Sequence, residues 1–384
     1  MKNRYIRTIF ACLLTFVLFL SGCTKKEDPE EHITRAIWFS FLDYQEILMG
    51  RDEKGYEGMV DQILDNVKSI GVNTIYLHAT AFTDAYHEST VYPRVKDYED
   101  LSYDPFAVFV KRAHEQNIQV EAWINPLRSV LEEETESWDD GFILKQWVKE
   151  NNERIRYVGG RYYLNPAYED VRELIVSNIR EILEKYDVDG IHLDDYFYPD
   201  GAGRSFDAYL YEEENYNEPI SREDFRRKQI NTLVREIHDT VKEKKKRFGI
   251  SVSGNNQYNY DSIYADVSYW MDEGLIDYLI PQIYWGFENP VRPYMPTTDE
   301  WIGIVGEYDT ELYVGLAAYK SGISDGYAGD AAQEWVDNHD ILKRQIDYAL
   351  EHGCKGYAFF RYYSLFDPEA SEAVQEEIQH LQAE

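Results

Sequence analysis

The chain has 384 residues, of which 71 are acidic and 39 are basic, giving a formal net charge of −32. This acidity argues against nucleic acid and anionic lipid headgroups as partners, because phosphate binding needs clustered Lys and Arg side chains. Apolar residues make up 44% of the chain, which excludes wholesale disorder, and its 33 Tyr, 8 Trp and 17 Phe suit a neutral, ring-shaped ligand.

The amino terminus has the pattern of a bacterial lipoprotein signal. Basic residues precede an apolar run over 9–20, which is too short to span a bilayer permanently. The run ends in Leu-Ser-Gly-Cys at 20–23, the pattern of a lipobox. We therefore expect residues 1–22 to be a signal peptide, Cys23 to carry lipid chains, and 23–33 to form a short tether. The expected location is extracytoplasmic in a bacterial cell envelope, with the membrane contacted through lipidated Cys23 only.

Further along the chain, short segments of strand character alternate with longer segments of helical period. Strands are predicted over 35–40, 73–78, 119–124, 189–194, 248–253, 278–284, 312–316 and 356–360. Helices are predicted over about 57–69, 105–116, 169–185, 222–245, 261–272, 339–351 and 369–381, with a shorter one around 299–306.

Eight strands, each followed by a helix, predict an α/β fold in which residues 34–384 form a (β/α)₈ TIM barrel. An open doubly wound sheet is the alternative, but no G-x-G-x-x-G turn follows the first strand. Two long connections, 125–168 after strand three and 195–221 after strand four, elaborate the face on which barrel enzymes build their sites.

Alternation along each strand sorts the side chains into two sets. Successive residues of a barrel strand point alternately to the helices and to the lumen, so the apolar positions assign their neighbours inward. The residues predicted to point inward are His78, Glu121, Trp123, Asn125, His192, Asp194, Ser251, Ser253, Gln282 and Tyr284. Polar groups from five strands at one barrel mouth indicate an active site, because a purely structural barrel would carry branched aliphatics there.

Asp194, at the end of strand four, is the first candidate for a catalytic carboxylate. Its partner is either the adjacent Asp195 or Glu288, which lies in the loop after strand six. Glycoside cleavage needs an acid together with a nucleophile or base, and substrate-assisted cleavage needs one acid and a stabilising partner. The alternatives are that the aspartates cap a turn and that Glu288 is a solvated loop residue.

The remaining inward groups have structural alternatives. Glu121 is expected to form a buried pair with Arg128 or Arg361, while His78 and His192 are expected to be hydrogen-bonding groups. Parity also allows a metal site made of His78, Glu121, His192 and Asp194. The nine histidines include no H-x-x-x-H or H-E-x-x-H motif, so we expect no metal and no cofactor, and activity that survives chelation.

Several motifs resemble the glycoside-hydrolase-like family ten, also called domain of unknown function 187. They are VNTIYLHATAFTDAYHES (72–89), YDPF (103–106), EAWINPLR (121–128), YYLNPAYEDVREL (162–174), YDVDGIHLDDYFYP (186–199), DFRRKQINTLV (224–234), FGISVSG (248–254) and YWMDEGLIDYLIPQIYW (269–285). Their order and spacing cover roughly residues 33–330.

The resemblance implies a barrel hydrolase that acts on glycans, and some lipoproteins of the family look like peptidoglycan glycosidases that prefer strands stripped of their peptide stems. By position it marks Asn125, Arg128, Asp194, Asp195, Tyr196, Gln282, Tyr284 and Trp285 as site residues. Two departures lie at the mouth. His78-Ala79-Thr80 stands where the family usually has Gln-Val-Arg, and residues 252–256 (VSGNN) stand where it has Pro-Phe-Gly followed by Trp.

These observations together predict a lipid-anchored, extracytoplasmic glycoside hydrolase, monomeric, that cleaves an amino-sugar polysaccharide. Peptidoglycan glycan strands are the favoured substrate. Asp194, Asp195 and Glu288 are the predicted catalytic residues, and the predicted substrate-binding residues are His78, Asn125, Arg128, His192, Tyr196, Gln282, Tyr284 and Trp285. The alternatives are a hydrolase of another extracellular polysaccharide and a non-catalytic, glycan-binding envelope lipoprotein, the latter motivated by the missing arginine.

Overall fold

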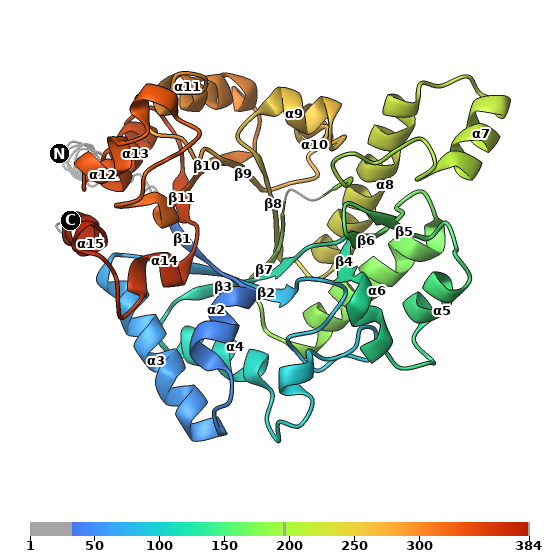
Figure 1. Ribbon diagram of the computed structural model, residues 1–384, viewed down its shortest axis with the longest axis horizontal. Coiled ribbons are helices and arrows are strands. Elements are labelled where there is room, and N and C mark those ends of the chain that lie inside the picture. The colour runs from blue at the N-terminus through green and yellow to red at the C-terminus, as the bar shows by residue number, and fades with distance from the viewer. Residues whose placement is uncertain (1–32, 195–196, 383–384) are drawn as a thin grey trace, which may run out of the picture. The chain divides into compact units, whose positions relative to one another are not determined.

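The computed structural model describes residues 33–194 and 197–382. Eight parallel strands close into a barrel in which each strand neighbours the next barrel strand along the chain and the last pairs with the first (Figure 1). The barrel strands are β1 (Thr34–Phe39), β2 (Thr74–Thr80), β3 (Gln119–Ile124), β7 (Gly190–Leu193), β8 (Arg247–Ser253), β9 (Tyr278–Gln282), β10 (Glu311–Leu316) and β11 (Gly356–Phe359). Each end lies within two residues of its predicted position, and helices lie between the strands, so the predicted (β/α)₈ barrel is confirmed.

Helices surround the barrel (Figure 1). The longer ones are α3 (Glu53–Ser69), α4 (Pro105–Glu115), α6 (Glu169–Lys185), α8 (Arg222–Glu243), α11 (Tyr294–Val305), α13 (Ile341–Glu351) and α15 (Glu372–Gln382). The shorter ones are α2 (Phe41–Asp43), α5 (Ile143–Lys149), α7 (Ala208–Asn217), α9 (Asn256–Asp261), α10 (Val267–Asp272), α12 (Glu334–Asp337) and α14 (Tyr362–Phe366). No helix in the described part of the chain is both long and apolar enough to cross a bilayer.

The helix predicted over 261–272 forms only over α10, while α9 ends at the first residue of the predicted range. Tyr264, between them, has a left-handed backbone conformation with φ of 59°, which a continuing α-helix does not tolerate. The carboxylate of Asp266 then accepts a hydrogen bond from the Tyr269 backbone N–H and caps the second helix. The apolar period continues through this break, which is why the sequence pattern did not reveal it.

The two faces of the barrel strands pack into separate buried clusters, as the alternation predicted. Residues such as Ile75, Ile191 and Ile250 join the large cluster between strands and helices. The lumen contains a second cluster made of Ala36, Trp38, Tyr76, Trp123, Tyr278, Ile280, Tyr313 and Ala358. Aromatic rings therefore fill the lumen, and the barrel has a solid floor beneath its mouth.

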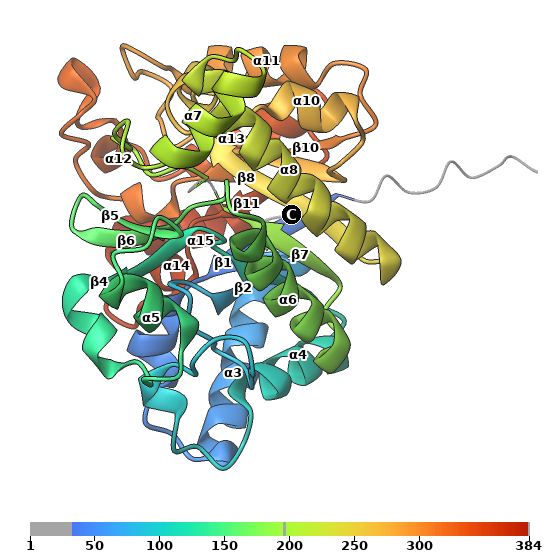
Figure 2. The ribbon, with the colours of Figure 1, turned by 90° about the vertical axis from the view of Figure 1, so that its right-hand side faces the viewer.

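The connection after β3 contains a small antiparallel sheet of its own. It consists of β4 (Arg128–Leu131), β5 (Ile155–Val158) and β6 (Arg161–Leu164), in the order β4-β6-β5. Helix α5 lies between β4 and β5 in the sequence. Figure 2 shows this sheet beside the barrel strands, with α5 packed near β5. The sequence predicted a long connection here but not the sheet inside it.

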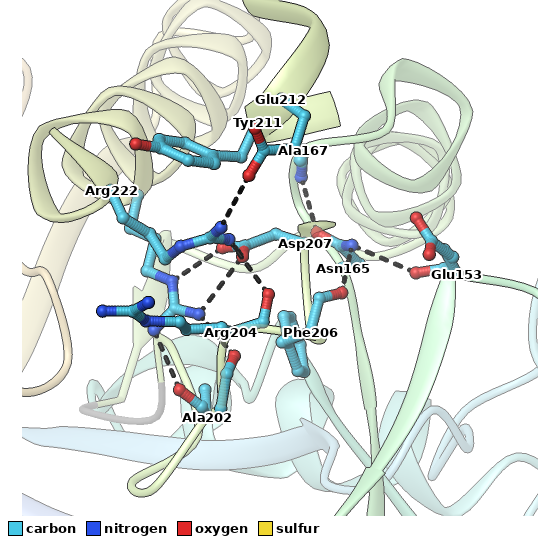
Figure 3. Close-up of polar contacts among 12 residues, drawn as sticks. Glu153, Asn165, Ala167, Ala202, Arg204, Phe206, Asp207, Tyr211, Glu212 and Arg222 are labelled. Carbon is cyan, nitrogen blue, oxygen red and sulfur yellow. Dashed lines mark hydrogen bonds and ion pairs between the residues drawn. The ribbon is translucent and has the colours of Figure 1, made fainter. Parts of the chain in front are cut away.

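A buried ion-pair cluster anchors the connection between β7 and α8 (Figure 3). Asp207 is fully buried and accepts hydrogen bonds of 2.6 Å from both Arg222 Nη1 and Arg226 Nε. The Asn165 side-chain amide donates to the backbone oxygen of Phe206 at 3.0 Å and so joins this connection to the one that follows β3. The two long connections are therefore fastened to each other and to α8.

Candidate active site

A cavity of about 260 Å³ opens at the carboxyl ends of the barrel strands. Six of the predicted site residues line it: His78, Asn125, Arg128, Asp194, Gln282 and Tyr284. They come from four barrel strands, β2, β3, β7 and β9, or the first residues after them, with Arg128 at the start of β4. The structure thus brings together groups that the strand alternation and the motifs predicted separately.

Gln282 fixes the orientation of the Asp194 carboxylate. Its Nε2 donates one hydrogen bond to Asp194 Oδ1 at 3.0 Å and another to Ser251 Oγ at 2.8 Å, so both of its amide hydrogens are used. Asp194 is 7% exposed and faces the cavity. A largely buried carboxylate held in one direction is the arrangement that general acid–base or nucleophilic catalysis requires.

His78 is held as a neutral ring whose single N–H is on Nε2. It stacks on Trp123 with ring centroids 3.6 Å apart and an 8° angle between the planes. Its Nδ1 accepts the Phe41 backbone N–H at 3.1 Å, so Nε2 carries the hydrogen. Burial lowers the pKa of His78 well below its ordinary value, and the nearby Arg128 adds to this effect.

Asn125 lies beside His78 and offers the complementary group. Its Nδ2 donates to the Ala81 backbone oxygen at 3.3 Å, which leaves Oδ1 as an acceptor. Asn125 is close enough to raise the pKa of His78 in part. A side-chain hydrogen bond between Asn125 and His78 accounts for that rise, and His78 Nε2 and Asn125 Oδ1 are both buried. The cavity wall therefore carries a donor and an acceptor side by side.

His192 belongs to the packed lumen and does not line the cavity. Trp38 Nε1 donates to its Nε2 at 3.0 Å, and its Nδ1 lies 3.0 Å from Tyr278 Oη. Burial lowers the pKa of His192 to about 3, so the ring is neutral. We therefore correct the prediction that His192 binds substrate, because both of its ring nitrogens already have protein partners.

Glu121 also points into the lumen but lies at the amino-terminal end of the barrel, level with Gly190. Tyr278 donates to its Oε2 at 2.5 Å, and burial raises the pKa of Glu121 to about 7, with Arg247 opposing that rise. The predicted pair with Arg128 or Arg361 is wrong, since Arg361 instead contacts Asp43 at 2.8 Å and Arg128 lines the cavity at the opposite end of the barrel.

The loop after β9 carries Trp285 and Glu288. The Glu334 carboxylate on α12 accepts the backbone N–H of Phe287 at 2.7 Å and that of Glu288 at 3.1 Å. Trp285 lines a neighbouring cavity, whereas the Glu288 side chain is exposed and lines neither cavity. The structure therefore does not bring Glu288 to Asp194, and the predicted residues Asp195 and Tyr196 lie outside the described residues.

Sequence reasoning missed several residues that shape the cavity. Ser40, Phe41 and Leu42 line it from the turn after β1, Tyr319 from the loop after β10, and Phe360 from the residue after β11. Strand alternation extrapolated beyond β11 could have found Phe360, but the loop residues follow no period. Within residues 33–194 and 197–382, no group of three or more His, Cys, Asp or Glu side chains is arranged to hold a metal ion.

Comparison with known proteins agrees with this architecture. The family model described as glycosyl hydrolase-like 10 matches residues 33–337, in accord with the resemblance of the motifs. Glycosyl hydrolase YngK of Bacillus subtilis (strain 168) is 30% identical over 362 residues, which cover 87% of this chain and 69% of that protein. Glycosyl hydrolase DigH of Escherichia coli O6:H1 is 29% identical over 426 residues, covering 95% of this chain and 94% of that protein.

Among solved structures, the glycoside hydrolase domain of PgaB (BpsB) from Bordetella bronchiseptica matches with a TM-score of 0.56. The match covers 92% of this chain and 99% of that domain, at 13% sequence identity. At this identity the likeness shows a shared fold.

Proposed function

Since the chain belongs to the glycosyl hydrolase-like 10 family and is a glycoside hydrolase, we propose that it cleaves an amino-sugar polysaccharide, namely the glycan strands of peptidoglycan. We propose further that it works outside the cytoplasm, held on a membrane by the lipid on Cys23. The sequence supports this location through its basic residues, its short apolar run and the Leu-Ser-Gly-Cys at 20–23.

The observation that carries the amino-sugar proposal is the paired donor and acceptor on the cavity wall. An acetamido group presents a carbonyl oxygen that accepts and an N–H that donates. His78 Nε2–H and Asn125 Oδ1 are buried and offer the complementary groups. The two residues hydrogen-bond each other, and a bound acetamido group would replace that contact with one hydrogen bond to each of them. A sugar that lacks this group could make neither bond, so the pair favours N-acetylated substrates.

Asp194 is the proposed catalytic carboxylate, because it faces the same cavity and Gln282 holds it in place. Asp195 is the favoured partner, since Glu288 is exposed and lines neither cavity. An acetamido group held at the cavity wall is also compatible with substrate-assisted cleavage, in which one acid and a stabilising partner suffice.

The test uses the full-length protein in detergent, incubated with peptide-free glycan strands and with intact cell-wall sacculi. Products are identified by mass spectrometry. We expect short oligosaccharides from the bare strands, and we expect Asp194→Asn to lower the rate by about 10²–10⁴-fold. Asp200→Asn is the matched control, because Asp200 is an exposed carboxylate on the same connection as Asp194.

Other outcomes would redirect the proposal. Cleavage of a neutral polysaccharide but not of the strands would establish a different glycan substrate. Binding of the strands with no product from the wild type would favour a glycan-binding role. Unchanged activity of Asp194→Asn would show that Asp194 is not the catalytic carboxylate.

A further inference from the structure

A second cavity of about 430 Å³ adjoins the one that contains Asp194. Gln282, Tyr284 and Tyr319 line both cavities, so the two lie side by side at the barrel mouth. The second cavity extends from there over the loops that follow β9 and β10, where Trp285, Lys320 and Tyr327 line it. Its volume lies within the ~300–1,000 Å³ that small-molecule sites usually occupy.

Exposed rings border this second cavity. In the loop after β10, Tyr327 is 97% exposed and Tyr319 is 40% exposed, and in the loop after β9 the aliphatic Val291 is 82% exposed. Large apolar side chains gain free energy when they leave water. Exposed apolar side chains that border a cavity are therefore typical of ligand sites, because a bound ligand covers them. Ring faces of Tyr and Trp pack well against the flat apolar faces of sugar rings while their polar edges stay in water.

Hydrogen bonds of Lys320 and Asp325 hold the loop that carries these tyrosines. Lys320 Nζ donates to the Tyr284 backbone oxygen at 2.8 Å and to Asp325 Oδ2 at 2.5 Å. Asp325, which is 4% exposed at its side chain, also accepts the Tyr327 backbone N–H at 3.1 Å. The backbone of Tyr327 is therefore held while its ring is exposed, so a ligand that stacks on it meets a backbone that is already ordered.

The charges that line the second cavity cancel. Lys320 and Asp325 pair with each other, and the remaining lining groups are aromatic, amide, hydroxyl and aliphatic. A cavity without net charge gives no electrostatic preference for an anion or a cation. Its chemistry fits a neutral pyranose ring.

We infer that the second cavity, which we call the Tyr319–Tyr327 groove, binds one sugar of a glycan while the adjacent sugar of the same chain occupies the Asp194 cavity. This inference rests on the proposed function, which places cleavage at Asp194. Its consequence is that the enzyme recognises at least two consecutive sugars and acts on chains in preference to single terminal residues. Tyr327 touches the second sugar only, and Tyr319 lies at the junction of the two cavities.

The test compares Tyr327→Ala with the wild type, both as full-length protein in detergent. Cleavage kinetics are measured on peptide-free glycan strands. Binding of N-acetylglucosamine oligomers of one, two and four units is measured by calorimetry in an Asp194→Asn background, which prevents turnover. Tyr216→Ala is the matched control, because Tyr216 on α7 is 89% exposed and lines neither cavity. Tyr327→Trp tests whether a ring of another type suffices.

We expect Tyr327→Ala to raise KM on the strands and the dissociation constant of the tetramer by roughly 3- to 10-fold, the effect of one lost ring contact. We expect kcat to stay within twofold of the wild type, and Tyr216→Ala and Tyr327→Trp to behave like the wild type. Monosaccharide binding should be unchanged in Tyr327→Ala, since that sugar occupies the Asp194 cavity.

Two other results are distinguishable. If the wild type cleaves the strands and Tyr327→Ala leaves both KM and tetramer binding unchanged, the groove is not a sugar site, while the proposed function stands. If the wild type neither cleaves the strands nor binds the oligomers, the proposed substrate and the groove assignment both fail.

Discussion

Replacing Asp207 tests how firmly the connection after β7 is anchored. Asp207 is fully buried, and its two partners are largely buried as well, with side chains 15% exposed for Arg222 and 3% for Arg226. In Asp207→Leu the Arg226 guanidinium would lose its carboxylate while remaining out of water, and Arg222 would keep only the exposed Glu212 carboxylate at 3.5 Å. Removing one partner of a buried ion pair costs about 3–5 kcal/mol, because the remaining charge stays desolvated.

The expected loss can be measured globally and locally. For a chain of this size, 3–5 kcal/mol corresponds to a fall in Tm of roughly 4–7 °C by calorimetry. Because the cluster holds a surface connection, local opening should accompany this loss, and trypsin should cleave after the exposed Arg204 much faster than in the wild type. Asp200→Asn, on the same connection but exposed, should leave both measurements unchanged.

A double-mutant cycle separates the ion pair from simple packing. Arg226→Met should destabilise the protein alone, and the double variant Asp207→Leu/Arg226→Met should lose about 1–3 kcal/mol less than the sum of the single variants. Additive losses, or a Tm of Asp207→Leu within 1 °C of the wild type with unchanged proteolysis, would refute the reasoning from burial and charge.

Three further predictions concern the lumen and the cavity. Burial raises the pKa of Glu121 from 4.5 to about 7, so the wild type should lose roughly 3 kcal/mol of stability as the pH rises from about 4.5 to about 7. In urea denaturation, Glu121→Gln should flatten this dependence of stability on pH. An equal dependence in the variant would contradict the reasoning. His78→Phe keeps an aromatic ring but removes the donor, so kcat/KM on N-acetylated strands should fall roughly 2- to 10-fold. The same fall on de-N-acetylated strands would argue against the acetamido contact. A Cβ at Gly249 would lie 2.0 Å from Tyr278 Cζ, so Gly249→Ala should lower stability by about 1–3 kcal/mol or more in thermal denaturation, whereas Gly141→Ala, in open space, should not.

The sequence predicted those parts of the site that depend on one strand at a time. The period of two placed Asp194 and Gln282 on the inward face, because alternation is a property of the strand itself. The partners of His192 depend on Trp38 and Tyr278 from two other strands, and no local pattern reports that three side chains meet in the lumen.

Loop geometry was the part that sequence reasoning could not supply. The position of Glu288 depends on the Glu334 carboxylate that holds its backbone, and the exposure of Tyr327 depends on Asp325 and Lys320. Such contacts follow no period, so the exposed rim of the mouth became visible only in three dimensions.

The pairing of β1 with β11 has a consequence for how activity is acquired. Thr34 aligns with Gly356, so the first strand of the barrel finds its second neighbour only when the last strand has formed. Bringing together segments so far apart in sequence costs loop-closure entropy and makes folding slow. Phe360, which lines the Asp194 cavity, directly follows that closing strand. A nascent chain that ends before residue 356 would therefore be an open sheet with two unpaired edges and an incomplete cavity, so the enzyme becomes active only at the final step of its own assembly.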